Sequence, residues 1–195
     1  MIDDAQEHPR RAVLRHAMEL AAGMLMVGPG TAATRNDATP TPRRPTAGKP
    51  GDFDFLAGEW KIRHRRLKAR GEWDEFDGEA TCWSILGGIG SVEELRIPAR
   101  DFSGLGLRLL DVDKRLWNDF WVNAKSGVLT TPGTTGSFED GEGIFVADDV
   151  DGATPIKVRG RWDRITGHSH RWQQAVSRDG GRTWETGWSM DWTRA

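Results

Sequence analysis

The sequence contains no tyrosine and one cysteine, and each scarcity excludes a kind of chemistry. Without tyrosine, no phenolic hydroxyl can act as an acid, a base or a nucleophile. Cys82 has no partner for an intramolecular disulfide, so the fold must be held together by its core. Because Cys82 lies between Thr81 and Trp83 in a strand-like pattern, we expect a buried, inert thiol.

Long apolar runs are also missing. No segment reaches the roughly 20 apolar residues that a membrane-spanning helix needs, so we expect no membrane span. No Gly-x-Ser-x-Gly nucleophile elbow occurs, and histidine is too sparse to support a Ser-His-Asp constellation. The sequence therefore gives no basis for a serine hydrolase.

His168 and His170 share one face of a predicted strand, as a metal site would require. A third ligand such as Glu75 or Asp77 would have to lie beside them, and no spacing guarantees that. A haem pocket would need one buried histidine and is disfavoured. Because Gly167 marks a turn beside the pair, we expect a solvated loop, with no metal and no cofactor.

The first 50 residues differ in composition from the rest. Residues 1–33 resemble a twin-arginine export signal: Arg10-Arg11-Ala12-Val13-Leu14-Arg15 is followed by an apolar stretch and by small residues at 30–33. Residues 34–50 are a Pro/Thr/Arg-rich linker, and residues 51–195 carry every aromatic side chain and form the folded domain. We expect a periplasmic or secreted protein. The alternative is an amphipathic N-terminal helix on a cytoplasmic protein.

From Trp60 onward apolar and polar residues alternate, which predicts an antiparallel all-β domain. Most breaks contain glycine, which supplies the positive φ that tight hairpin turns demand. Such a sheet has open edges unless it closes, so we expect an up-and-down barrel of about 8–10 strands, with a two-sheet sandwich as the alternative. The predicted strands are 59–68, 73–86, 91–97, 105–112, 115–123, 127–131, 142–148, 155–163, 169–177 and 183–192.

The last two strands are the most clearly marked. Residues 171–192, RWQQAVSRDGGRTWETGWSMDW, predict a hairpin about Asp179-Gly180-Gly181. The pattern Ser177-x-Asp179-x-Gly181-x-Thr183-Trp184 resembles the Asp-box of sialidase-type propellers, in which the Asp and Ser tie the turn. One copy cannot build a propeller, so the motif supports only a hairpin.

The opening of the domain carries a wider resemblance. Gly58-x-Trp60 resembles the first-strand motif of lipocalins and other calycin-like barrels, in which the Trp closes the floor beneath an Arg near the last strand; Arg194 is the candidate here. Over residues 53–194 the chain more specifically resembles DUF1579, a bacterial family of unknown function. This implies a calycin-like fold and no established activity. The resemblance is carried by FLAGEW (55–60), Trp73-x-Glu75-Phe76-x-Gly78, Leu86-Gly87-Gly88, Leu107-Arg108, Gly136-x-Phe138-x-x-Gly141, and RWQQAVSRDGGRTWE with Trp188 and Met190.

A basic run, residues 63–70, is the one feature that suggests nucleic acid, because clustered cations release counterions from phosphates. If Arg70-Gly71 forms a two-residue turn, however, Arg66 lies opposite Glu75 and His64 opposite Asp77. Such cross-strand charge pairs stabilise a sheet. We therefore expect a self-paired strand face and no nucleic-acid partner.

The ten tryptophans are spread over most of the predicted strands. If they point inward, they either fill the barrel as core or line a cavity for a flat, apolar molecule, and both alternatives stay open. Arg108 alternates with Leu107 and Leu109, and if it faces inward it must be paired. The predicted ligand-binding residues are Trp121, Trp172, Trp188, Arg108 and Gln174.

The sequence thus favours an exported barrel that binds a small apolar or aromatic molecule. The alternative is an enzyme on the same scaffold, a hydrolase or isomerase in which a carboxylate works beside an arginine that steadies negative charge. Its candidate carboxylates are Glu94 and Glu75, with Glu93 also plausible. A filled structural barrel is the third hypothesis. Homodimerisation stays open.

Overall fold

A computed structural model describes residues 47–195. The predicted export signal and all but the end of the predicted linker lie outside these residues. The described part contains ten β-strands and three short 3-10 helices. The strands are β1 (Gly58–Ala69), β2 (Glu72–Ile85), β3 (Gly90–Ile97), β4 (Phe102–Asp111), β5 (Leu116–Asn123), β6 (Thr134–Glu139), β7 (Glu142–Asp151), β8 (Thr154–Asp163), β9 (Ser169–Ser177) and β10 (Glu185–Arg194). The 3-10 helices are η1 (Asp54–Leu56), η2 (Leu86–Gly88) and η3 (Pro98–Arg100).

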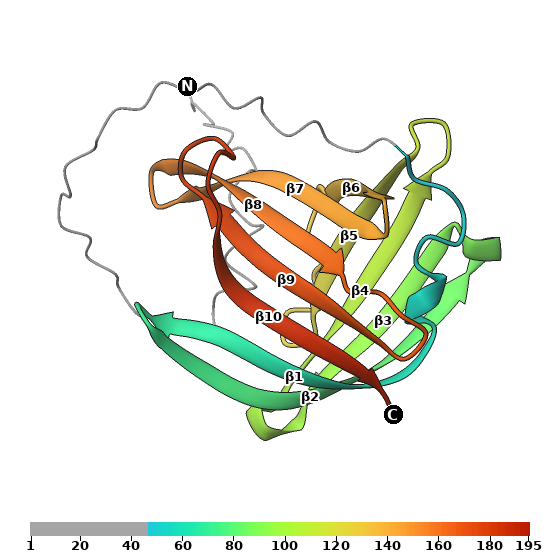
Figure 1. Ribbon diagram of the computed structural model, residues 1–195, viewed down its shortest axis with the longest axis horizontal. Helices are drawn as coiled ribbons and strands as arrows, with labels where there is room; N and C mark the ends of the chain where they lie inside the picture. The colour runs from blue at the N-terminus through green and yellow to red at the C-terminus, as the bar shows by residue number, and fades with distance from the viewer. Residues whose placement is uncertain (1–46) are drawn as a thin grey trace, which may run out of the picture.

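The strands form a closed, antiparallel, up-and-down barrel. Each strand pairs with its neighbours in sequence, and β1 pairs with β10, so the first and last strands lie side by side (Figure 1). An even number of strands lets every pair in such a ring be antiparallel, and closure leaves no exposed sheet edge. The predicted barrel is confirmed, and the sandwich alternative is wrong.

The sixth strand was predicted in the wrong place. Residues 127–131 contribute only an isolated bridge between Val122 and Leu129, and the strand that pairs with β5 and β7 is β6, further along the chain. Pro132 has no backbone N–H to donate to a ladder, so regular pairing resumes after it. The apolar residues Val128 and Leu129 are exposed rather than half-buried. These two apolar residues therefore do not belong to a half-buried sheet face.

The predicted register between β1 and β2 is off by one residue. A bulge between Leu67 and Ala69 places Arg65 opposite Glu75 and turns His64 toward Phe76. Because side chains alternate between faces, this shift sends His64 into the barrel. On the outer face, the basic residues of β1 still form ion pairs with the acidic residues of β2. Arg63 contacts Glu75 and Asp77 at 3.0 Å each, and Arg65 contacts Glu75 at 3.1 Å.

One end of the barrel is closed by Trp60, η1 and Arg194. Arg194 Cζ lies 4.2 Å from the centre of the Trp60 ring, and its guanidinium donates to the carbonyl oxygens of Ala57 and Phe55. Trp60 Nε1 donates to the carbonyl of Leu56 at 2.7 Å. The candidate arginine from the sequence therefore lies over the expected tryptophan. A packed aromatic core fills this end: Phe53, Leu56, Trp60, Trp117 and Trp192 are each at most 2% exposed.

The β9–β10 turn is held by Asp179. Its carboxylate accepts hydrogen bonds from the backbone N–H of Thr183 and Arg182, from the Thr183 hydroxyl and from the Ser177 hydroxyl. These hydrogen bonds lower the pKa of Asp179, and the bond from the backbone N–H of Thr183 has the largest effect. The hairpin predicted from the Asp-box pattern is thus present, with strand pairing outward from Val176 and Glu185. No helix in residues 47–195 is long and apolar enough to cross a membrane.

Candidate functional site

A cavity of about 160 Å³ lies inside the barrel. Its walls come from strands β3 to β10 and from the connection between β5 and β6. Most of the lining is apolar or aromatic, with a few polar groups among it. The lining residues are Glu93, Leu95, Phe102, Arg108, Asp119, Phe120, Trp121, Thr130, Pro132, Thr134, Ala147, Val158, Trp162, Trp172, Gln174, Trp188, Met190 and Trp192.

All five residues predicted from the sequence to bind a ligand line this one cavity. Trp121 comes from β5, Arg108 from β4, and Trp188 from β10, while Trp172 and Gln174 come from β9. They lie on two pairs of consecutive strands, β4 with β5 and β9 with β10, and meet because each points inward on its own strand. Near η1 the tryptophans are packed as core, and beyond Trp162 and Trp192 they line the cavity.

Glycines on β4 make room for two of the cavity's side chains, Arg108 and Trp121. Gly104 and Gly106 alternate with Leu105 and Leu107, so they share the inner face with Arg108. A Cβ on Gly106 would lie 3.0 Å from Arg108 Nη2, and a Cβ on Gly104 would overlap the Trp121 ring. The middle of β4 is therefore inverted, with Leu105 and Leu107 on the outer face and with Gly104, Gly106 and Arg108 on the inner face.

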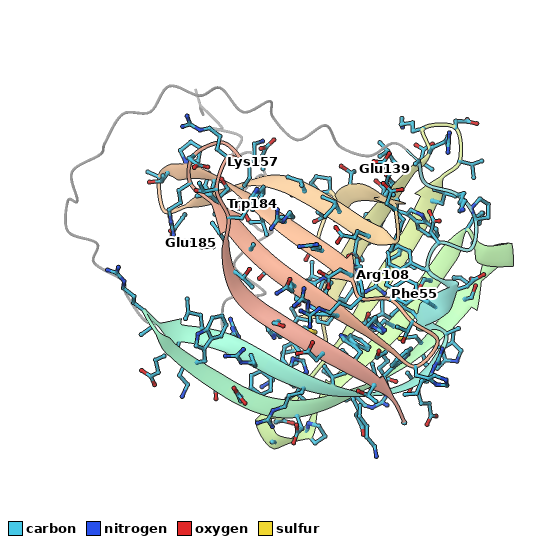
Figure 2. All side chains as sticks on the ribbon, viewed as in Figure 1. Phe55, Arg108, Glu139, Lys157, Trp184 and Glu185 are labelled. Carbon is cyan, nitrogen blue, oxygen red and sulfur yellow. The ribbon has the colours of Figure 1, made fainter. Side chains whose placement is uncertain are left out.

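Arg108 is the buried charge at the centre of the site. Its Nη2 donates to Glu93 Oε2 at 2.6 Å, and its Nε lies 3.4 Å from Asp119 Oδ1. The side chains of Arg108 and Glu93 are only 5% and 4% exposed. Cζ of Arg108 lies 5.0 Å from the centre of the Trp162 ring and 5.2 Å from that of Phe53. Figure 2 shows Arg108 toward the end of the barrel that carries Phe55, away from Trp184 and Lys157.

Two of these groups have shifted pKa values. Burial alone would lower the pKa of Arg108, but the nearby charges of Glu93 and Asp119 more than offset it, so the pKa is raised and the guanidinium is charged. Burial raises the pKa of Asp119 to about 6, with Arg108 opposing the shift and Glu93 adding to it. The cavity therefore contains the buried ion pair of Arg108 and Glu93 and a second carboxyl group, that of Asp119, whose pKa is raised.

A buried histidine positions one of the cavity tryptophans. Trp188 Nε1 donates to His64 Nδ1 at 3.2 Å, and the His64 ring stacks on Phe76 with centroids 4.6 Å apart. Burial, helped by the charge of Arg100, lowers the pKa of His64 to about 4, so the ring is neutral and can accept this bond. Trp188 then meets Trp172 edge to face at 5.8 Å. Sequence reasoning missed this role because the predicted register placed His64 outside.

His170 is not in a solvated loop, as the sequence suggested, but in the packed core. It is 2% exposed and lies between Trp60 and Trp192, with ring centroids 4.5 and 4.8 Å away. Neither ring nitrogen has a hydrogen-bond partner. Burial lowers its pKa to about 3, with Arg108 and Arg194 adding to the shift. His168 is exposed, because it precedes β9 and lies in the connection between β8 and β9.

The candidate catalytic carboxylates lie on the outside of the barrel. Glu94 is exposed and contacts Arg96 at 3.0 Å, and Glu75 is paired with Arg63 and Arg65. Neither lines the cavity. Any carboxylate chemistry inside the barrel would have to use Glu93 or Asp119.

No group of three potential metal ligands occurs within residues 47–195. His170 is surrounded by aromatic rings, and His64 is bonded to Trp188. Cys82 is buried, and burial raises the pKa of its thiol, as expected for an inert cysteine.

Comparison with known proteins does not assign a family. No family model matches the chain. No curated protein matches it. One solved structure that it resembles is a protein of unknown function from the DUF3598 family of Nostoc punctiforme, with 12% sequence identity and a TM-score of 0.41 over 77% of this chain. The match spans about half of that protein, 52% of its chain.

These findings correct the DUF1579 assignment made from the sequence. No family model supports it, and the solved structure described above belongs to DUF3598 instead. The motifs that suggested DUF1579 have local explanations in the barrel. FLAGEW forms η1 and the start of β1, and the closing segment forms the hairpin about Asp179.

Proposed function

We propose that the protein binds a small, largely apolar or aromatic molecule inside the barrel. The observation that carries this proposal is the cavity itself, which is lined by indole rings from β5, β8, β9 and β10. An apolar cavity of roughly 150 Å³ is large enough to hold benzene. A cavity of about 160 Å³ therefore suits a molecule built on one aromatic ring.

The arrangement of the cavity supports binding rather than incomplete packing. Trp188 is held by its hydrogen bond to His64, and Trp121 stacks with Phe102 at 6.4 Å with 14° between the rings. Glycines at positions 104 and 106 leave the space that the Trp121 ring and the Arg108 guanidinium occupy, which fixes both groups in the cavity wall. Rings that are fixed before binding lose little entropy when a ligand arrives, which favours affinity.

A cavity-filling substitution tests the proposal. In the wild-type protein, benzyl alcohol is expected to quench tryptophan fluorescence and to raise the melting temperature as its concentration increases. Ala147 lines the cavity, and Ala147→Phe is expected to fill it and to reduce the affinity by at least about tenfold, which corresponds to 1.4 kcal/mol of lost contact. Fluorescence titration of both proteins gives the two dissociation constants.

The matched control is Val146→Phe. Val146 is the next residue along β7 and is not part of the lining, so its side chain points to the other face of the sheet. This variant should bind benzyl alcohol as the wild type does. Equal binding by wild type and Ala147→Phe would show that the ligand does not enter the barrel.

Export from the cytosol also remains part of the proposed function. It is supported by the Arg10-Arg11 motif and by a domain that contains a single, buried cysteine and so needs no oxidation to fold.

A further inference from the structure

We propose that the cavity selects an organic cation, such as a benzylic or aromatic ammonium compound, over a neutral or anionic molecule of the same shape. This inference rests on the proposed function, because it names the chemical class that the same cavity would take. It is carried by the charges in the lining and by which of them a ligand can reach.

The lining carries more negative than positive charge. Its charged residues are Glu93, Arg108 and Asp119, which come from the neighbouring strands β3, β4 and β5. Glu93 and Arg108 neutralise each other through a 2.6 Å hydrogen bond, whereas Asp119 comes only within 3.4 Å of Arg108 Nε. When Asp119 is ionised, one negative charge is left over.

Asp119 is also the charge that a ligand can reach. Its side chain is 23% exposed and lines the cavity, whereas Arg108 and Glu93 are almost completely covered. Nε and Nη1 of Arg108 have no hydrogen-bond partner but are buried. An incoming molecule therefore meets a carboxylate first, and a carboxylate accepts hydrogen bonds and attracts cations.

The other charged groups near the barrel interior do not cancel this charge. Arg66 lies over the Trp188 ring at 5.1 Å, and Arg100 is paired with Asp74 at 2.5 Å, but none of the three lines the cavity. The charges that act on Asp119 are those of Arg108 and Glu93.

Uncharged groups complete the surroundings of Asp119. On the side of β6, the residue paired with Asp119 is Thr134, which carries no charge. Cys82, on β2 near Arg108 and Glu93, has a raised thiol pKa and is uncharged.

The indole rings of the lining suit a cation as well. The face of tryptophan is the best aromatic surface for an ammonium or guanidinium group. The protein already uses two of its inward-facing rings in this way, with Arg108 over Trp162 at 5.0 Å and Arg66 over Trp188 at 5.1 Å. Trp121 and Trp172 line the cavity as well, and their rings are where the cationic end of a ligand would lie while it approaches Asp119.

Three probes of the same shape test the inference: benzylammonium, benzyl alcohol and benzoate, each titrated by tryptophan fluorescence. At pH 8 benzylammonium is expected to bind at least about tenfold more tightly than benzyl alcohol, and benzoate more weakly than either. Between pH 8 and pH 5.5 the affinity for benzylammonium should fall about fourfold as Asp119 takes up a proton, given its pKa of about 6, while that for benzyl alcohol stays constant.

Two variants separate local charge from net charge. Asp119→Asn should remove both the preference for benzylammonium and its pH dependence, while benzyl alcohol still binds. Asp77→Asn makes the same charge change on the outer face of β2, where Asp77 is 82% exposed, and should leave the preference intact.

The possible results are distinguishable from failure of the proposed function. If benzyl alcohol binds but benzylammonium binds no better, the inference is wrong and the proposed function stands. Tighter binding of benzoate would mean that Arg108 meets the ligand, and would also overturn it. If none of the three binds, both the inference and the proposed function fail.

Discussion

Replacing Arg108 by methionine is expected to lower the free energy of unfolding by about 3–5 kcal/mol, the usual cost of breaking a buried ion pair by removing one partner. Glu93 is 4% exposed, and the bond from Arg108 Nη2 at 2.6 Å is what neutralises it. Without Arg108, Glu93 would have to stay charged in an apolar surrounding or take up a proton. Urea unfolding at pH 7 measures the change.

The double variant Glu93→Met/Arg108→Met is the decisive comparison. Apolar residues that replace both partners of a buried pair often cost little, so this variant should be more stable than Arg108→Met. Arg96→Met serves as the surface control, because its pairs with Glu79 and Glu94 are partly exposed and should cost less than about 1 kcal/mol. A loss below about 1 kcal/mol for Arg108→Met would mean that the ion pair is not buried.

Acid is expected to destabilise the barrel through its two buried histidines. His64 and His170 have folded-state pKa values of about 4 and about 3, below the value of about 6.5 in the unfolded chain. Below pH 6.5 the unfolded state therefore binds more protons, so stability is full above that pH and falls as the pH decreases. At pH 5 each histidine costs about 2 kcal/mol, and Asp119, whose pKa is raised, offsets about 1 kcal/mol. The expected net loss between pH 8 and pH 5 is about 3 kcal/mol.

Histidine variants identify the source of this pH dependence. His170→Phe keeps a flat ring beside Trp60 and Trp192 and should remove about 2 kcal/mol of the expected loss of about 3 kcal/mol. His168→Gln, two residues away and exposed, should leave the pH profile unchanged. Urea unfolding at several pH values gives the profile. A wild-type stability that stays constant from pH 8 to pH 5 would contradict the burial of both rings.

Most of the fold could be predicted from the sequence because a closed antiparallel barrel has a local signature. Period-two alternation shows which segments are strands, and glycine turns show where they reverse. The failures came from features that alternation does not report. A single bulge after Leu67 changed the register of β1 against β2. Pro132 interrupts the pairing, so the sixth strand begins only at Thr134.

The cavity-lining residues were predicted better than the carboxylates. Aromatic residues that alternate with polar ones show which side of a strand is inner, and this placed Trp121, Trp172 and Trp188. The same argument favours Glu93 over Glu94. Glu93 lies two residues before Leu95 and four before Ile97, so it shares the inner face of β3 with them. Asp119 was missed although it has the same parity as Trp117 and Trp121 on β5. Its raised pKa comes mainly from burial, with a further contribution from Glu93 on β3, and neither is visible in the alternation along β5.

The most direct test of the central claim is a crystal structure of the protein soaked with 4-bromobenzyl alcohol, with anomalous data collected at the bromine edge. The account predicts one bromine peak inside the barrel, with the ring among Trp121, Trp172 and Trp188. Bromine peaks only on the outer surface, with the interior filled by the protein's own side chains, would contradict it.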